Sequence, residues 1–150
     1  MRKMLIGLFL ILPNILLAEF YDTAKGPDLK VFPEISIQVL DGAKNGCWTN
    51  IGEVKRYAED KLELAGARVT SENNYLWAPS ATLEIEVNAV RAKNGNCLGM
   101  LYTSIVSKSN QGSYFHIQVF SRLNNIFSGY QNANELALEH VGEALGYWVK

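Results

Sequence analysis

The sequence predicts a single α+β domain, with two helices packed on one face of a mixed or largely antiparallel sheet of five or six strands. Three observations predict this fold. Several segments alternate apolar and polar residues, two longer segments repeat apolar residues at helical spacing, and Asn94-Gly95 marks a hairpin. The expected order is β-α-β-β-β-β-(β)-α. A chain of 150 residues is long enough for one core of this kind.

Residues 1–18 have the composition of a secretory signal peptide. Arg2 and Lys3 precede an apolar run, which Pro13 interrupts before Ala18 offers a small residue for cleavage. The run is short for a membrane span. We therefore expect cleavage after Ala18 and a periplasmic or secreted protein that keeps no membrane span.

An uncleaved amino-terminal anchor is the alternative, because Leu16 stands where a small residue is preferred before the cleavage point. After cleavage, residues 19–33 are expected to form an irregular lead-in and residues 34–150 the single domain. The mature chain would keep 12 of the 14 basic residues beside all 15 acidic ones, a net charge of −3. Its basic residues are scattered singly, so neither nucleic acid nor an acidic membrane surface is an expected partner.

Cys47 and Cys97 are the only cysteines, and thiols pair in the oxidising environment that an exported chain meets. A disulfide between them would close a loop of about 50 residues and contribute roughly 4 kcal/mol in the chain-entropy model. A free reactive thiol and a metal site are the alternatives. Neither His116 nor His140 lies near a cysteine in the sequence. We therefore expect the disulfide, with Trp48 covering it or the core, and neither a metal nor a cofactor.

The first half of the domain predicts a strand followed by a helix. Residues 34–43 alternate apolar and polar side chains, as in a half-buried strand. Residues 50–66 repeat apolar residues on one helical face. Asn50 and Glu53 have the spacing of a capping box at the start of this helix, and Gly66 can adopt the left-handed conformation that ends it.

Residues 81–107 predict a long β-hairpin, because Asn94-Gly95 favours the positive φ angles of a two-residue type I′ loop. Such a loop sets Val87 opposite Tyr102. It also gathers apolar and aromatic residues of both strands on one face of the sheet, which supports this register.

With this register, Leu101 and Ile105 lie on the second face of the sheet among polar residues. Two helices are too few to cover both faces of a sheet with five or six strands, so we expect both helices on the first face. The second face would then meet solvent or a partner. The alternative is that residues 19–33 or the loop at residues 72–80 cover these two apolar side chains.

The remaining elements are strands and a closing helix. Asn124-Asn125 is expected to turn the chain between the last two strands, and Asn132 or Asn134 to cap the helix. The strands are predicted over residues 67–71, 113–123 and 126–130, and the helix over residues 132–150.

No recognisable catalytic motif is present: there is no glycine-rich phosphate loop after a strand, no serine elbow and no paired-histidine zinc motif. The candidate acid–base groups are His116, His140 and the pair Glu84 and Glu86. The two glutamates would lie about 7 Å apart on one strand face, a spacing that could suit glycosidase carboxylates. The alternation of apolar and polar residues alone explains the two glutamates as the polar side of a half-exposed strand. Both histidines are expected at the surface or rim, so we do not expect an enzyme.

Three passages, "LELAGARV", "ATLEIEVNAV" and "NELALEHVGEALGYWV", span most of residues 35–150. Together with the order of elements, they resemble the small α+β domains of bacterial envelope accessory proteins, such as the amino-terminal domain of TolB. The resemblance implies a domain that docks other envelope components, and it carries over no functional residue. The cysteine pair and the segment "ENNYLWAP" are not part of that pattern.

The sequence therefore predicts an exported, non-catalytic binding or adaptor protein of the bacterial cell envelope. The candidate partner-binding residues are Leu101 and Ile105 on the second sheet face, and Tyr75 and Trp77 in the loop at residues 72–80. One alternative is a small secreted hydrolase that uses His116 or the glutamate pair. The other is an inhibitor or immunity-like protein that binds through its aromatic loop.

Overall fold

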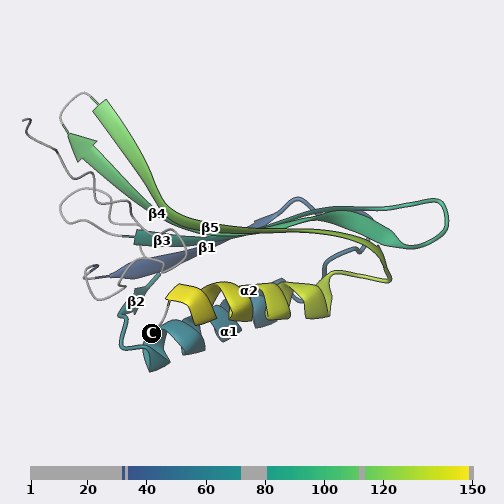
Figure 1. Cartoon of the computed structure of the whole chain (residues 1–150), viewed down its shortest axis with the longest axis horizontal. Coiled ribbons are helices and arrows are strands. Elements are labelled where there is room, and N and C mark those ends of the chain that lie inside the picture. Colours follow the sequence, from purple (N-terminus) through teal and green to yellow (C-terminus); the bar gives the residue numbers. More distant parts are fainter. Residues whose placement is uncertain (1–31, 33, 72–80, 112–113, 149–150) are drawn as a thin grey trace, which may run out of the picture.

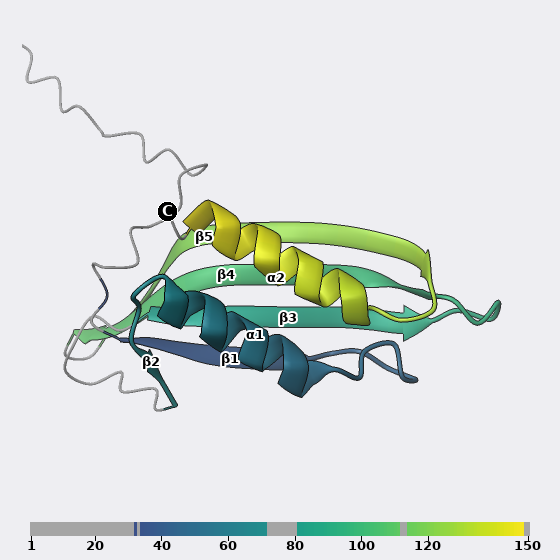
Figure 2. The same ribbon diagram turned by 90° about the horizontal axis from the view of Figure 1, so that it is seen from below.

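The computed structural model describes residue 32 and residues 34–71, 81–111 and 114–148, with side chains except over residues 108–121. It confirms the predicted α+β domain: one sheet of five strands carries both helices on the same face (Figure 1, Figure 2). In chain order the elements are β1 (Ile35–Asp41), α1 (Ile51–Leu64), β2 (Val69–Thr70), β3 (Ala81–Arg91), β4 (Cys97–Gln111), β5 (Tyr114–Tyr130) and α2 (Asn134–Trp148).

The sheet is mixed and has the strand order β2-β1-β3-β4-β5. β1 pairs in parallel with β2 and β3, whereas β3, β4 and β5 pair antiparallel. Parallel neighbours need a crossover connection, and α1 supplies it between β1 and β2. The core lies between the helices and the first sheet face. Its buried side chains include Ile35, Val54, Ala58, Leu62, Leu83, Ile85, Val87, Val141, Ala144 and Leu145.

The end of α1 follows from its local sequence. Gly66 has a φ of 84°, the left-handed conformation that glycine adopts without strain. Its amide donates to the carbonyl of Glu63 at 2.8 Å, and the amide of Ala67 donates to the carbonyl of Leu62 at 3.0 Å. These two hydrogen bonds form a Schellman motif, so the predicted stop signal is confirmed.

The β3–β4 hairpin forms around Asn94-Gly95, but its predicted loop is wrong by one residue. The amide of Ala92 donates to the carbonyl of Asn96 at 2.8 Å, and the amide of Gly95 donates to the carbonyl of Ala92 at 3.0 Å. Within the loop only Gly95 has a positive φ, of 85°. These contacts define a three-residue loop, in which a type I turn precedes a left-handed glycine.

The longer loop changes which residues face each other across the hairpin. Val87 pairs with Leu101, and Leu83 pairs with Ile105. A shift of one residue in register moves every side chain of a strand to the opposite face. Leu101 and Ile105 consequently face the helices and are buried in the core. Their predicted position on the second face is therefore wrong.

β5 runs without a break over Tyr114–Tyr130, so the turn predicted at Asn124-Asn125 is wrong. In the structure, these two residues pair with Tyr102 and Leu101 of β4. Strand preference depends strongly on the neighbouring strand, and a continuous partner in β4 outweighs the turn preference of two exposed asparagines.

Candidate functional site

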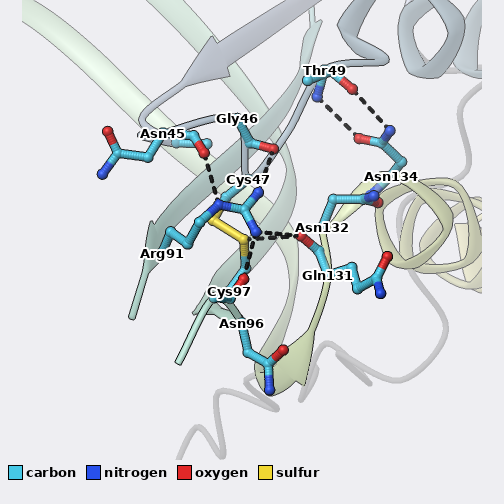
Figure 3. The surroundings of a disulfide bond; sticks show 12 residues. Asn45, Gly46, Cys47, Thr49, Arg91, Asn96, Cys97, Gln131, Asn132 and Asn134 are labelled. Carbon is cyan, nitrogen blue, oxygen red and sulfur yellow. Dashed lines mark hydrogen bonds between the residues drawn. A yellow bond between two sulfur atoms is a disulfide. The ribbon is translucent and has the colours of Figure 1, made fainter. Parts of the chain in front are cut away.

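The predicted Cys47–Cys97 disulfide is present and joins the β1–α1 connection to the first residue of β4 (Figure 3). The two Cα atoms are 5.7 Å apart, and both side chains are fully buried. The adjacent Trp48 is buried in the core. The disulfide lies at the end of the sheet where three connections meet, those over residues 42–50, 92–96 and 131–133.

Arg91 links all three connections beside the disulfide (Figure 3). Its guanidinium donates at 2.6–3.1 Å to the backbone carbonyls of four residues: Asn45, Gly46, Gly95 and Gln131. Charge-assisted hydrogen bonds are stronger than neutral ones, so this side chain holds the loops in fixed positions. Nothing in the sequence pattern singles out Arg91, because its acceptors are backbone atoms from separate segments.

The start of α2 is tied to the start of α1. Asn134 Oδ1 accepts from the amide of Thr49 at 3.0 Å, and Asn134 Nδ2 donates to Thr49 Oγ1 at 2.9 Å. The predicted capping box of α1 is wrong, since the side chain of Asn50 bonds no first-turn amide. It accepts from Trp48 Nε1 at 2.9 Å and donates to Glu53 at 3.0 Å. Asn50 Nδ2 also donates to the carbonyl of Asn134 at 3.2 Å, so a contact with α2 takes part in holding this side chain.

The second face of the sheet carries four adjoining apolar side chains near the end that carries the disulfide. Val90 pairs with Leu98, and Met100 pairs with Ile126. Leu98 and Met100 are two residues apart on β4 and therefore share a face. The exposed fractions of Val90, Leu98, Met100 and Ile126 are 43%, 44%, 37% and 79%. We call these four side chains the apolar patch, and no helix in the described part of the chain covers it (Figure 1).

Polar and charged side chains border the apolar patch. The hydroxyl of Tyr102 donates to Met100 Sδ at 3.1 Å, and the guanidinium of Arg122 lies 5.6 Å from the centre of the Tyr102 ring. On β3, Asn88 donates to the carboxylate of Glu86 at 2.6 Å. An apolar centre inside a polar rim is the usual composition of a protein-binding surface.

The apolar patch ends where the same sheet face becomes buried. Ser36 of β1 and Thr82 of β3 share a hydroxyl hydrogen bond of 3.0 Å, and both residues are buried. Ser104 and Val106 of β4 are buried as well. The apolar patch thus lies towards the disulfide end of the sheet.

The predicted acid–base candidates with described side chains lie on two sides of the sheet. Glu84 and Glu86 are half-buried on the second face of β3, whereas His140 lies in α2 on the other side of the sheet. His116 belongs to β5, and its side chain is outside the described residues. Among the candidates whose side chains are described, the glutamate pair and His140 therefore lie on opposite sides of the sheet.

His140 is buried, so its predicted place at the surface or rim is wrong. Burial lowers its pKa below the ordinary value of 6.5, and the backbone carbonyl of Leu123 and the carboxylate of Glu143 offset only part of this effect. Neither ring nitrogen makes a hydrogen bond of normal geometry to a described residue. The local environment thus favours a neutral imidazole in the core.

Two pockets lie beside the helices. One, of about 400 Å³, is lined by residues at the end of β5 and the start of α2, including Glu135 and Glu139. The other, of about 260 Å³, lies between the carboxyl ends of α1 and α2. Neither is lined by a histidine or by the Glu84–Glu86 pair. Tyr75 and Trp77 lie outside the described residues.

Among the described residues, no three or more histidine, cysteine, aspartate or glutamate side chains gather in a way that could hold a metal ion. None of the described helices has both the length and the apolar character needed to cross a membrane.

Comparison with known proteins found distant structural likenesses. No protein-family model and no curated protein matches the sequence. A dodecamer of a PelC variant from Paraburkholderia phytofirmans is 17% identical, with a TM-score of 0.49, covering 81% of this chain and 92% of that one. A second PelC dodecamer from the same organism is 12% identical, with a TM-score of 0.47 and coverage of 83% and 95%. A minor lipoprotein from Acinetobacter baumannii is 11% identical, with a TM-score of 0.33 and coverage of 77% and 88%. None of these three is named as a TolB domain.

Proposed function

We propose that the protein is an exported, non-catalytic binding protein that docks another protein of the bacterial envelope through the apolar patch. The observation that carries this proposal is the exposure of four adjoining apolar side chains on a sheet face that no described helix covers. Contiguous exposed apolar surface is typical of protein–protein contact sites. Export is supported by the buried disulfide and the predicted signal segment, because disulfides persist in oxidising compartments.

The paired strands and fixed loops that carry the apolar patch favour binding without large rearrangement. β3 and β4 each have a paired strand on both sides, and Arg91 and the disulfide hold the loops at the same end. A surface that is already ordered loses little conformational entropy when a partner binds. The complementary partner surface would be apolar at its centre and polar around it.

The test is a pair of serine substitutions within the apolar patch, Leu98→Ser with Met100→Ser. Both side chains are exposed, so the domain should remain folded while affinity for the partner falls by roughly 2 kcal/mol or more, about thirtyfold. Tagged protein would capture partners from the envelope fraction, with identification by mass spectrometry and affinity measured on the purified partner.

The matched control is Leu64→Ser with Tyr147→Ser, which removes two exposed apolar side chains from the helices. This variant should capture the partner as the unmodified protein does. Equal capture by the patch variant and the unmodified protein would contradict docking at the apolar patch, provided that both show the same thermal unfolding.

A further inference from the structure

Among the described strands, β5 forms one margin of the sheet and pairs with β4 alone. It follows β4 in the strand order, and no other described strand lies beyond it (Figure 2). Register shifts in the β4–β5 pairing flank a regular stretch over residues 121–128. Such an edge presents unpaired backbone N–H and C=O groups that can pair with another strand.

Between its two register shifts, this edge carries only one of the features that usually prevent pairing with another chain, the charge of Arg122. Edge strands are commonly very short, or carry lysine or proline. Residues 123–130 contain no charged residue and no proline, and Asn124, Asn125 and Ile126 are exposed. At the opposite margin, β2 covers the start of β1, and the uncovered remainder of β1 ends at Asp41.

The exposed edge can also complement a second copy of itself. Antiparallel pairing centred on Asn125 places Leu123 of each copy opposite Phe127 of the other on the helix side, where Leu123 is half-buried and Phe127 is buried in the core of its own copy. Arg122 falls opposite Ser128, and therefore no like charges oppose each other. A contact in which both copies use the same residues is isologous and closes at two copies.

We propose that two copies of the chain pair antiparallel through residues 122–128 of β5, around a two-fold axis. Joining two sheets of five strands gives one continuous sheet across the dimer. Ile126 belongs both to this edge and to the apolar patch, so dimerisation brings the two patches onto one adjoining surface. A strand pair of this length buries less than the roughly 1,200 Å² of a standard interface, so the dimer is weak and concentration-dependent.

Sedimentation equilibrium of the mature protein tests this proposal at concentrations from about 10 μM to about 1 mM. The unmodified protein is expected to show a monomer–dimer equilibrium. Asn125→Glu and Asn125→Lys each place like charges opposite one another and should weaken dimerisation about tenfold or more. An equimolar mixture of the two variants should restore a dimer, because opposite charges then face each other.

The matched controls are Leu64→Glu and Leu64→Lys, which place the same charges on the exposed surface of α1 and should leave dimerisation unchanged. A protein that stays monomeric at the highest concentration overturns the proposal, as does a series of assemblies larger than the dimer. If both Asn125 variants dimerise as strongly as the unmodified protein, the proposal is overturned too.

A measurement on the unmodified protein keeps the test decisive if the Asn125 variants fail to fold. Amide hydrogen exchange in the β5 segment should slow as concentration rises, and constant exchange rates contradict the pairing. The inference stands independently of docking: the Leu98→Ser and Met100→Ser variant should still dimerise, since neither residue lies on the edge strand. Loss of partner capture and loss of dimerisation are therefore separable outcomes.

Discussion

Arg91 illustrates how a single side chain can organise one end of this domain. Its guanidinium reaches four backbone carbonyls in three connections, whereas the adjacent disulfide joins only two segments. The planar guanidinium carries five N–H donors in a fixed arrangement, and a lysine ammonium carries only three on a flexible stem. The position therefore requires arginine specifically, and positive charge alone would not satisfy the same acceptors.

His140 predicts a dependence of stability on pH. Its folded-state pKa is lowered chiefly by burial, so the unfolded chain binds a proton at a higher pH than the folded chain does. The contribution of neutral His140 to the free energy of unfolding is fully present above about pH 6.5, the pKa of its imidazole in the unfolded chain. This contribution is lost as the pH falls towards the lower pKa of the folded state. Between about pH 7.5 and about pH 5.5, the free energy of unfolding should fall by at most about 1.4 kcal/mol per pH unit because of this residue.

Urea unfolding of the His140→Leu variant checks this prediction, because the variant should lose that part of the pH dependence. The comparison is His116→Gln. This variant removes the other histidine of the chain and should keep the pH dependence of stability. If the pH dependence is the same in His140→Leu as in the unmodified protein, buried His140 is not its source.

At the scale of elements, the hairpin loop decides which face each β4 side chain occupies. Gly95 has a φ of 85°, where a Cβ atom introduces strain although no neighbouring atom stands in its way. Gly95→Ala should therefore lower the free energy of unfolding by about 1 kcal/mol. The matched substitution Gly52→Ala in the first turn of α1 meets no neighbouring atom and should be neutral or slightly stabilising. Thermal unfolding of both variants tests the difference, and equal effects would contradict it.

β5 shows how pairing between elements outweighs local preference. Asn124 and Asn125 favour a turn as an isolated pair, yet both lie within a strand because β4 supplies a continuous partner. The same pairing leaves Ile126 exposed beside Met100, so the apolar patch exists only because two strands distant in sequence lie in this register.

At the scale of the whole molecule, the disulfide should make a large contribution to stability. Replacing Cys47 and Cys97 together by alanine should lower the free energy of unfolding by roughly 4 kcal/mol, because the unfolded chain regains the freedom of a loop of about 50 residues. Alanine suits both sites, since both cysteines are fully buried. Chemical denaturation with and without a reductant provides the measurement. The reductant should destabilise only the unmodified protein, and equal stability of the two proteins would argue against the entropic account.

The sequence by itself determined the features that depend on neighbouring residues or on composition. Apolar periodicity predicted both helices and most strands, and Gly66 predicted the end of α1. The pairing of Cys47 with Cys97 followed from a cysteine count of two in a chain with an export signal. Two helices beside five or six strands also predicted that both helices pack on one face of the sheet, since two helices cannot cover both faces.

Only the tertiary structure decided which side chains occupy each face and which residues meet across long distances. Asn94-Gly95 is compatible with a two-residue or a three-residue loop, and the choice places either Leu101 or Met100 on the uncovered face. The burial of His140 and the contacts of Arg91 likewise depend on segments far apart in the chain. The physical reason is that local preferences fix the conformation of a segment, whereas register and burial depend on the other segments against which it packs.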